Sequence, residues 1–208
     1  HMTNKILHMK KDKINKILFA INRNAAASPF LSLSSLSTLA KDVLPDGWIK
    51  AGSTPNDFTV GIDETITFDG SKSVFIEGVN PETKGFVALT QVSSVKDYLG
   101  QRVQLTFNIK SQSIFGWSGG WFRVDGASDE ILAFDNMGNR PIVKTTDWKK
   151  YSIVLDVPKD AKRMLYGVLL KGTGKVWFDN LNFEIVDKNT PVTDIYASKA
   201  QNLGFEKN

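Results

Sequence analysis

The sequence predicts an all-β protein: an antiparallel β-sandwich of two sheets, of jelly-roll type, with a short helical arm at its N-terminus. From residue 44 onward, about ten short β-rich runs are separated by Gly, Pro, Asn and Asp. This spacing, without helical patterns between the runs, is typical of sandwiches and jelly rolls. Hydrophobic residues make up 41% of the 208 residues, including 13 Phe and 5 Trp. That content is sufficient for a core buried between two sheets.

Residues 1–43 form the predicted arm. Four apolar residues recur at i, i+3, i+4 and i+7, which places them in one stripe along a helix: Ile14, Ile17, Leu18 and Ile21. The helix is expected to end at Ser28–Pro29, because the residue before a proline avoids helical backbone angles. We expect the arm to pack on the sandwich or to join copies of the chain into a homo-oligomer.

Charge is concentrated in this arm. Seven Lys or Arg and two Asp within residues 1–45 give +5, so the overall charge of +4 leaves −1 for the rest of the chain. A nearly neutral body does not favour binding to nucleic acid. The sequence has no Cys and no apolar run near the ~20 residues that would span a bilayer. We expect a cytoplasmic protein without a membrane span, with secretion left open.

Residues 102–110 show the clearest strand pattern. Apolar residues alternate there with polar ones, as in an antiparallel strand with one buried face: Val103, Leu105, Phe107 and Ile109. Residues 151–157 and 175–186 repeat the alternation, but the second run does not keep one register throughout. A β-bulge near Asp179–Asn180 would restore it.

The sandwich is expected to occupy residues 44–187, followed by a tail or linker over residues 188–208. Periodicity is lost from Asn189, and Pro191 marks the exit from the core. The segment NLGFE at 202–206 has two interpretations. It is a vestigial linker, or it folds back to complete a sheet, since the termini of a sandwich often lie close together.

Seven blocks together resemble one known type of bacterial domain: LPDGW (44–48), GFVALTQV (85–92), YLGQRVQLTFNIKS (98–111), GWFRVDG (120–126), LAFDNMGNRPI (132–142), TTDWKKYSIVLDVP (145–158) and GVLLKGTGKVWFDNLNFEIVD (167–187). They are similar to galactose-binding-like jelly-roll modules, which are related to carbohydrate-binding modules. Such modules occur fused to AraC-type bacterial regulators and as accessory domains of some bacterial hydrolases. The resemblance implies a β-sandwich with an accessory role, and the fold alone implies no particular ligand. Residues 14–40 also resemble the opening of an AraC-type helix-turn-helix region, but no second recognition helix follows.

Aromatic residues are the best candidates for ligand contacts. Trp117 and Trp121 are four residues apart, and so share a face if the strand is regular. A sugar ring can stack on such a platform while neighbouring polar groups bind its hydroxyls. The candidate polar groups are Gln91, Arg123, Asp125, Asn136 and Arg140. The alternative is that Trp117 and Trp121 fill the core, where we expect Trp148 and Trp177.

A calcium site is the candidate metal centre. Asp125, Asp129 and Asp135 fall in one loop-rich segment, and carboxylate oxygens suit calcium. The alternative is a set of solvated turns, which favour Asp in any case. Asp135 could instead form an ion pair with Arg140.

The sequence does not favour catalysis. His1 and His8 are the only histidines, so the sandwich has no imidazole base. Hydrolysis by paired carboxylates stays open, because their separation cannot be inferred from sequence. We predict a non-catalytic binding module for a carbohydrate or another polar small ligand, serving as the sensory or accessory part of a transcriptional regulator. The alternative is a structural or protein-interaction module. No cofactor is expected beyond the calcium ion.

Overall fold

The computed structural model describes residues 42–196. The N-terminal arm, except its last two residues, and the NLGFE segment lie outside the described residues. Eight strands are present in the described part, together with the 3-10 helices η2 (Pro55–Asp57) and η3 (Lys96–Tyr98): β1 (Ile49–Gly52), β2 (Phe58–Asp63), β3 (Ser73–Gly78), β4 (Phe86–Ser94), β5 (Arg102–Asp125), β6 (Ile131–Asp135), β7 (Ile142–Asp156) and β8 (Arg163–Val186). All strand pairs are antiparallel, which confirms the predicted fold class. Within residues 42–196, no helix is long and apolar enough to cross a membrane.

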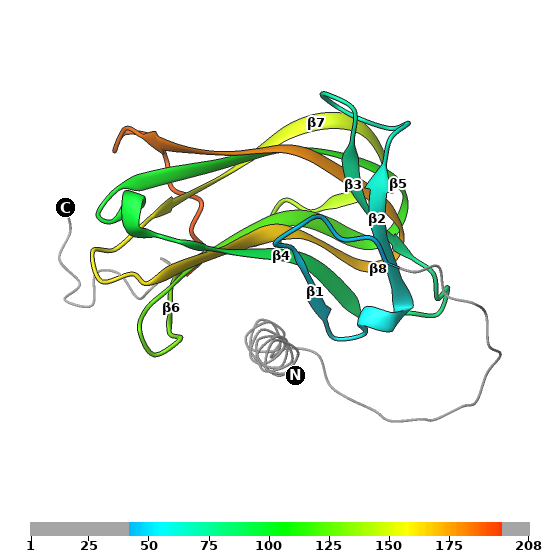
Figure 1. Ribbon diagram of the computed structural model, residues 1–208, viewed down its shortest axis with the longest axis horizontal. Helices are drawn as coiled ribbons and strands as arrows, with labels where there is room; N and C mark the ends of the chain where they lie inside the picture. Colours follow the sequence, from blue (N-terminus) through cyan, green and yellow to red (C-terminus); the bar gives the residue numbers. More distant parts are fainter. Residues whose placement is uncertain (1–41, 197–208) are drawn as a thin grey trace, which may run out of the picture.

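Two long strands, β5 and β8, build both layers of the sandwich. They pair with each other along almost their whole length, from Arg102–Val186 to Asp125–Arg163, and both bend midway (Figure 1). The upper layer, as we call it, consists of β7, the first half of β5 and the last half of β8. The lower layer consists of β6, the second half of β5, the first half of β8, β4 and β1. Strands β2 and β3 continue the sheet from the middle of β8.

Glycines at the bend let the two long strands turn together. Gly116 in β5 faces Gly172 in β8, and their φ angles are +117° and +84°. A Cβ atom on Gly116 would lie 2.2 Å from the Lys171 carbonyl oxygen, and one on Gly172 would lie 2.1 Å from the Phe115 carbonyl oxygen. Only glycine tolerates this backbone approach. Residues 42–196 therefore form eight strands where the sequence suggested about ten β-rich runs, because some of the expected breaks between runs are bends within continuous strands.

The main core lies between the layers and confirms the alternation predicted for residues 102–110. Val103, Leu105, Phe107 and Ile109 are all fully buried. They meet apolar residues of the lower layer: Val87, Leu89, Phe122, Val124, Val168 and Leu170. The Phe107 ring lies on Gly120, where a Cβ atom would come within 2.0 Å of it. A side chain at 120 would therefore displace the ring from the core.

The β-bulge predicted near Asp179–Asn180 is present. Thr106 and Asn108 of β5, two residues apart, pair with Asn182 and Asp179 of β8, three residues apart. The extra residue is accommodated at Asn180, whose φ angle is +56°. The bulge restores the register of the last strand, as the sequence required.

Trp177 is buried, as expected, although outside the cluster between the layers, whereas the expectation of a core position is wrong for Trp148. Val176 and Phe178 point into the core, and alternation turns Trp177 to the opposite face of β8. Trp177 is nevertheless buried, and its Nε1 donates a hydrogen bond to Asp63 Oδ2 at 2.9 Å. Trp148 is only partly buried and contacts the exposed Phe68 ring.

Candidate ligand-binding sites

The outer face of the lower layer carries three of the predicted site residues. Trp121, Arg123 and Asp125 alternate along β5 with two core residues, and all three are buried, with exposed fractions of 1%, 0% and 0%. Trp121 belongs to a second apolar cluster, which we call the outer cluster. Its buried members are Ala51, Ala88, Trp121, Phe134, Leu165 and Leu169, and Ile49, Phe86, Trp117 and Ile131 pack against them. Trp117 and Trp121 therefore share a face, but it is the outer face rather than the core.

Arg123 and Asp125 form a buried ion pair instead of presenting free polar groups. Arg123 Nε and Nη2 donate to Asp125 Oδ1 and Oδ2, both at 2.7 Å. Arg163 approaches the same carboxylate at 3.5 Å. Burial raises the pKa of the Asp125 carboxyl, and the hydrogen bonds and charge of Arg123 oppose that rise. The Asp125 carboxylate is thus occupied by two arginines.

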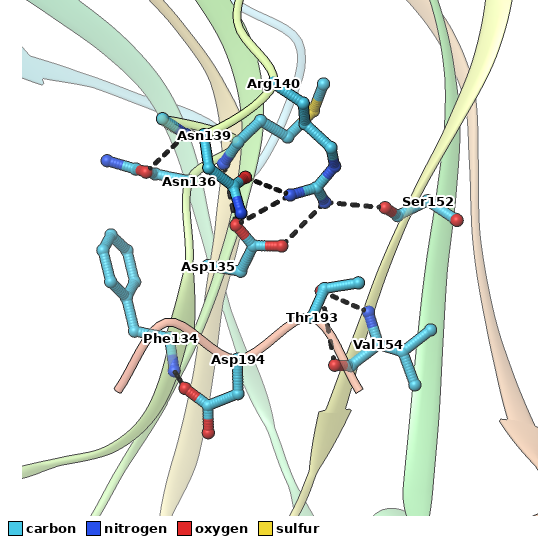
Figure 2. A network of polar contacts seen from close by, with 11 residues as sticks. Phe134, Asp135, Asn136, Asn139, Arg140, Ser152, Val154, Thr193 and Asp194 are labelled. Atoms are coloured by element: carbon cyan, nitrogen blue, oxygen red, sulfur yellow. Dashed lines mark hydrogen bonds and ion pairs between the residues drawn. The ribbon is translucent and has the colours of Figure 1, made fainter. Parts of the chain in front are cut away.

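Asp135, Arg140 and Asn136 lie together at the edge where β6 and β7 face each other (Figure 2). Arg140 Nη2 donates to Asp135 Oδ2 at 2.7 Å and to the Ser152 carbonyl of β7 at 3.0 Å. The Asn136 side chain accepts a hydrogen bond from the Gly138 backbone at 2.9 Å. The anticipated Asp135–Arg140 ion pair is therefore present. It ties the two layers together along this edge.

The start of the tail forms hydrogen bonds with both strands of this edge, β6 and β7. The Thr193 backbone N–H donates to the Val154 carbonyl of β7 at 2.9 Å. In return, the Val154 backbone N–H donates to Thr193 Oγ1 at 3.0 Å. Phe134 of β6 donates to Asp194 Oδ1 at 3.1 Å and accepts from the Ile195 amide at 2.9 Å. Figure 2 shows the segment passing between the two strands. The described part of the predicted tail thus packs on the sandwich.

The three aspartates proposed for calcium do not form one site. Asp125 and Asp129 both pair with Arg163, whereas Asp135 pairs with Arg140. Within residues 42–196, no three acidic or imidazole side chains come close enough together to share a metal ion. The reason is electrostatic, since an arginine already neutralises each of these carboxylates.

Gln91 lies on the other side of the lower layer from Trp121. Its neighbour Leu89 points into the core, and Gln91 Oε1 accepts a hydrogen bond of 2.7 Å from Tyr166. The Tyr166 hydroxyl also lies 2.8 Å from Ser93 Oγ. Gln91 therefore cannot join a site built on the outer face.

A pocket of about 330 Å³ opens at the β2–β3 end of the sandwich, away from the predicted residues. Its lining is mainly apolar and comes from segments far apart in sequence: Pro45, Trp48, Ile62, Val74, Phe178 and Leu181. Lys72, Ser73, Asp179 and Asn180 supply its polar atoms. The volume falls within the range of small-ligand sites. Two features already visible in the sequence, the LPDGW turn and the Asp179–Asn180 bulge, form two of its walls.

The pocket walls are held in place by internal contacts. The Trp48 ring centroid lies 5.8 Å from that of Phe178 and 6.2 Å from that of Tyr166. Asp179 Oδ2 accepts backbone hydrogen bonds from Phe68 and Asp69, both at 3.1 Å. Asn180 is exposed, and its left-handed φ of +56° is unusual for a residue with a side chain. Such bulges are frequent beside functional sites, where they redirect a side chain.

These features define an antiparallel β-sandwich module with an aromatic-lined pocket at one end and a buried apolar outer face. None of the known protein-family models matches the sequence. The chain is 38% identical over 167 residues, 77% of its length, to the uncharacterized HTH-type transcriptional regulator YbfP of Bacillus subtilis (strain 168). It spans 57% of the length of that regulator.

Solved structures show the same architecture. The enzymatically active domain of the bacteriophage CBA120 tailspike protein 4 matches with a TM-score of 0.54 at 18% identity, over 68% of this chain and 20% of that one. At this identity the match concerns the fold alone. The CBM22-1 xylan-binding domain of Paenibacillus barcinonensis Xyn10C matches with a TM-score of 0.48 at 15% identity, over 68% of this chain and 86% of that domain. An HTH-type transcriptional regulator is thus among the proteins similar to this chain, in line with the resemblance expected from the sequence.

Proposed function

We propose that this chain is a non-catalytic binding module for a carbohydrate or a similar polar, ring-shaped ligand, and that the ligand occupies the pocket beside Trp48. The observation that carries the proposal is the composition of this pocket: about 330 Å³, with aromatic and aliphatic walls and a few polar groups. That combination is typical of small-ligand sites. It also suits a sugar, whose C–H face packs on an aromatic ring while its hydroxyls form hydrogen bonds.

Each wall of the pocket has a distinct role in this proposal. The Trp48 and Phe178 rings provide the apolar platform. The backbone N–H of Asn180 donates to Asp179 Oδ1 at 2.7 Å. Its side-chain amide makes no hydrogen bond with any described residue, so it offers two N–H donors and a carbonyl acceptor to ligand hydroxyls. Lys72 at the rim adds a donor, because its ion pair with Glu64 at 3.3 Å is exposed and therefore weak.

The similarity to a regulator supports a sensory role for the module. A ligand that binds only the folded pocket would stabilise the surrounding strands, and such a change can be passed to an attached domain. The basic arm is not required for ligand binding in this proposal. Both histidines precede residue 42, so none of them belongs to the described sandwich.

The test is isothermal titration of the full chain with neutral mono- and oligosaccharides, together with the variant Asn180→Gly. Glycine adopts φ +56° without strain, so the variant removes the amide and keeps the backbone. We expect Kd to rise about 5- to 10-fold, the cost of roughly one hydrogen bond. Lys144→Gly is the matched control, since Lys144 is exposed and also has a positive φ, of 60°, outside the pocket lining.

Two results would contradict the proposal. One is the absence of binding by any member of the saccharide panel. The other is an affinity that is unchanged in Asn180→Gly but lost in Trp117→Phe, which would move the site to the outer face.

A further inference from the structure

The outer cluster is buried although only one layer contributes to it. All ten of its residues come from β1, β4, β5, β6 and β8, the strands of the lower layer. Trp121 is 1% exposed, Ala88 0% and Leu169 8%. A single sheet cannot bury its own outer face, so a covering segment is required. The described strands and 3-10 helices do not supply one.

Two buried polar atoms on the same face point to the same conclusion. Trp121 Nε1 and Thr90 Oγ1 are buried and have no hydrogen-bond partner among residues 42–196. Trp121 pairs with Gly167 of β8, and Gly167 pairs with Thr90 of β4. The two side chains therefore flank a position without a side chain. Buried polar atoms without partners are rare in native proteins, so the covering segment should bring polar groups of its own.

We propose that the N-terminal arm, residues 1–41, docks on the outer cluster through the stripe of Ile14, Ile17, Leu18 and Ile21. An amphipathic helix on the apolar face of a sheet is one of the standard ways in which two layers pack. Asn22 follows Leu18 by four residues and so lies beside the stripe. Its side-chain carbonyl can accept a hydrogen bond from Trp121 Nε1.

The point at which the described chain begins makes this docking feasible. Asp42 accepts hydrogen bonds from the Val60 amide at 3.0 Å and from Lys50 of β1 at 2.8 Å. The arm therefore joins the sandwich beside β1, an edge strand of the lower layer. Residues 22–41 connect the stripe to this anchor. At ~3.3 Å per residue they span far more than the width of five strands at ~4.8 Å each.

The arm fits the outer cluster better than the tail does. The stripe supplies four branched apolar side chains at helical spacing, whereas residues 197–208 contain only Leu203 and Phe205 as large apolar side chains. The described end of the tail is bound at the β6 edge through Ile195. A second copy of the chain is the remaining occupant, and the experiment below separates all three.

Disulfide scanning in the full chain tests the docking, because the chain contains no native Cys. Phe86→Cys, on the outer cluster, is combined in turn with Cys at Ile14, Ile17, Leu18 or Ile21. Lys16→Cys and Arg23→Cys, on the other side of the stripe, are the controls. We expect an intramolecular disulfide from at least one stripe position under mild oxidation and none from the controls, since a disulfide needs Cα atoms within ~7 Å.

A second measurement does not depend on disulfide geometry. Ile17→Asp places a charge in the stripe, and Lys16→Asp is its matched control. We expect Ile17→Asp alone to shift tryptophan emission to longer wavelength, because Trp117 and Trp121 become exposed to water.

Three results would overturn the proposal. Intermolecular disulfides alone would assign the outer cluster to a second copy. If Phe86→Cys forms a disulfide with Leu203→Cys and with none of the arm positions, the tail covers the outer cluster. Equal cross-linking of stripe and control positions, with no emission shift in Ile17→Asp, would show that the arm does not dock.

Discussion

The two apolar clusters of this sandwich lie on opposite faces of the same strands, yet they are covered in different ways. In β5, Phe122 and Val124 point into the main core, whereas Trp121 points into the outer cluster. The main core draws residues from both layers, so each apolar side chain there has described partners on the opposite sheet. The outer cluster draws on the lower layer alone. Burial of the main core therefore follows from packing between the two described layers, whereas burial of the outer cluster is what the proposed docking of the arm would explain.

The contrast extends to polar groups. The outer face holds the Arg123–Asp125 ion pair, with both side chains fully buried. It also holds Trp121 Nε1 and Thr90 Oγ1, which have no hydrogen-bond partner in the described part of the chain. An ion pair or polar group removed from water is costly unless it is well hydrogen-bonded. The side of the main core also buries polar groups, such as Asp135 and Ser118, but each of these has a described hydrogen-bond partner.

The largest expected effect comes from the main core. Phe107→Ala should lower the free energy of unfolding by ~3–5 kcal/mol, because it removes a fully buried ring that packs on Gly120. Urea denaturation followed by circular dichroism measures this change. Phe115→Ala is the control, since Phe115 is 83% exposed, and we expect less than ~0.5 kcal/mol there. Similar losses in both variants would contradict this account of the core.

The outer cluster should respond almost as strongly, but only while it is covered. Leu169→Ala should cost ~2–4 kcal/mol in the intact chain, the usual cost for a buried leucine. Combined with Ile17→Asp, its additional cost should fall below ~1 kcal/mol, since the face is then already open to water. A double-mutant cycle by urea denaturation measures this coupling. Additive losses would show that the arm does not cover Leu169.

Trp177 provides a smaller, pH-dependent test, because it is buried in neither cluster. Burial raises the pKa of its partner Asp63, but hydrogen bonds from the Ile66 amide, Trp177 Nε1 and Thr65 outweigh this and hold the pKa well below the ordinary value. A carboxyl with a lower pKa in the folded state adds stability above its unfolded pKa, near 3.9, and loses it as the pH falls.

The free energy of unfolding should therefore fall less steeply below about pH 4 in Asp63→Asn than in the parent chain. Glu64→Gln, on the exposed neighbouring residue, is the control and should keep the parent slope. Urea titrations at a series of pH values give both curves. Parallel curves for the parent and Asp63→Asn would rule out a depressed Asp63 pKa.

Local patterns in the sequence predicted local structure well. The alternation of residues 102–110 follows directly from the period of a strand, and the Asp179–Asn180 bulge follows from the break in that period. Arg140 could be assigned to Asp135 because only four residues, folded as a turn, separate them. Each of these inferences needs only neighbouring residues.

Inferences that depend on distant strands were less complete. Gln91 and Trp121 belong to different strands, and only the β4–β8–β5 register shows that they face opposite sides of the layer. The pocket was not anticipated, because its lining comes from residues near 45–48, 62, 72–74 and 178–181. Such convergence depends on the bend of β5 and β8, which the sequence signals only through the glycines at 116 and 172.

The smallest expected effect on stability concerns the pocket and separates it from both clusters. Asn180→Gly should leave the free energy of unfolding unchanged or raise it by up to ~1 kcal/mol, because glycine adopts the φ of +56° without strain. Saccharide affinity should nevertheless fall, since the amide contributes to binding and not to packing. Thermal denaturation with and without ligand measures both effects in one experiment. A loss of stability in the ligand-free variant would instead make Asn180 a structural residue of the bulge, comparable to the buried residues of the main core.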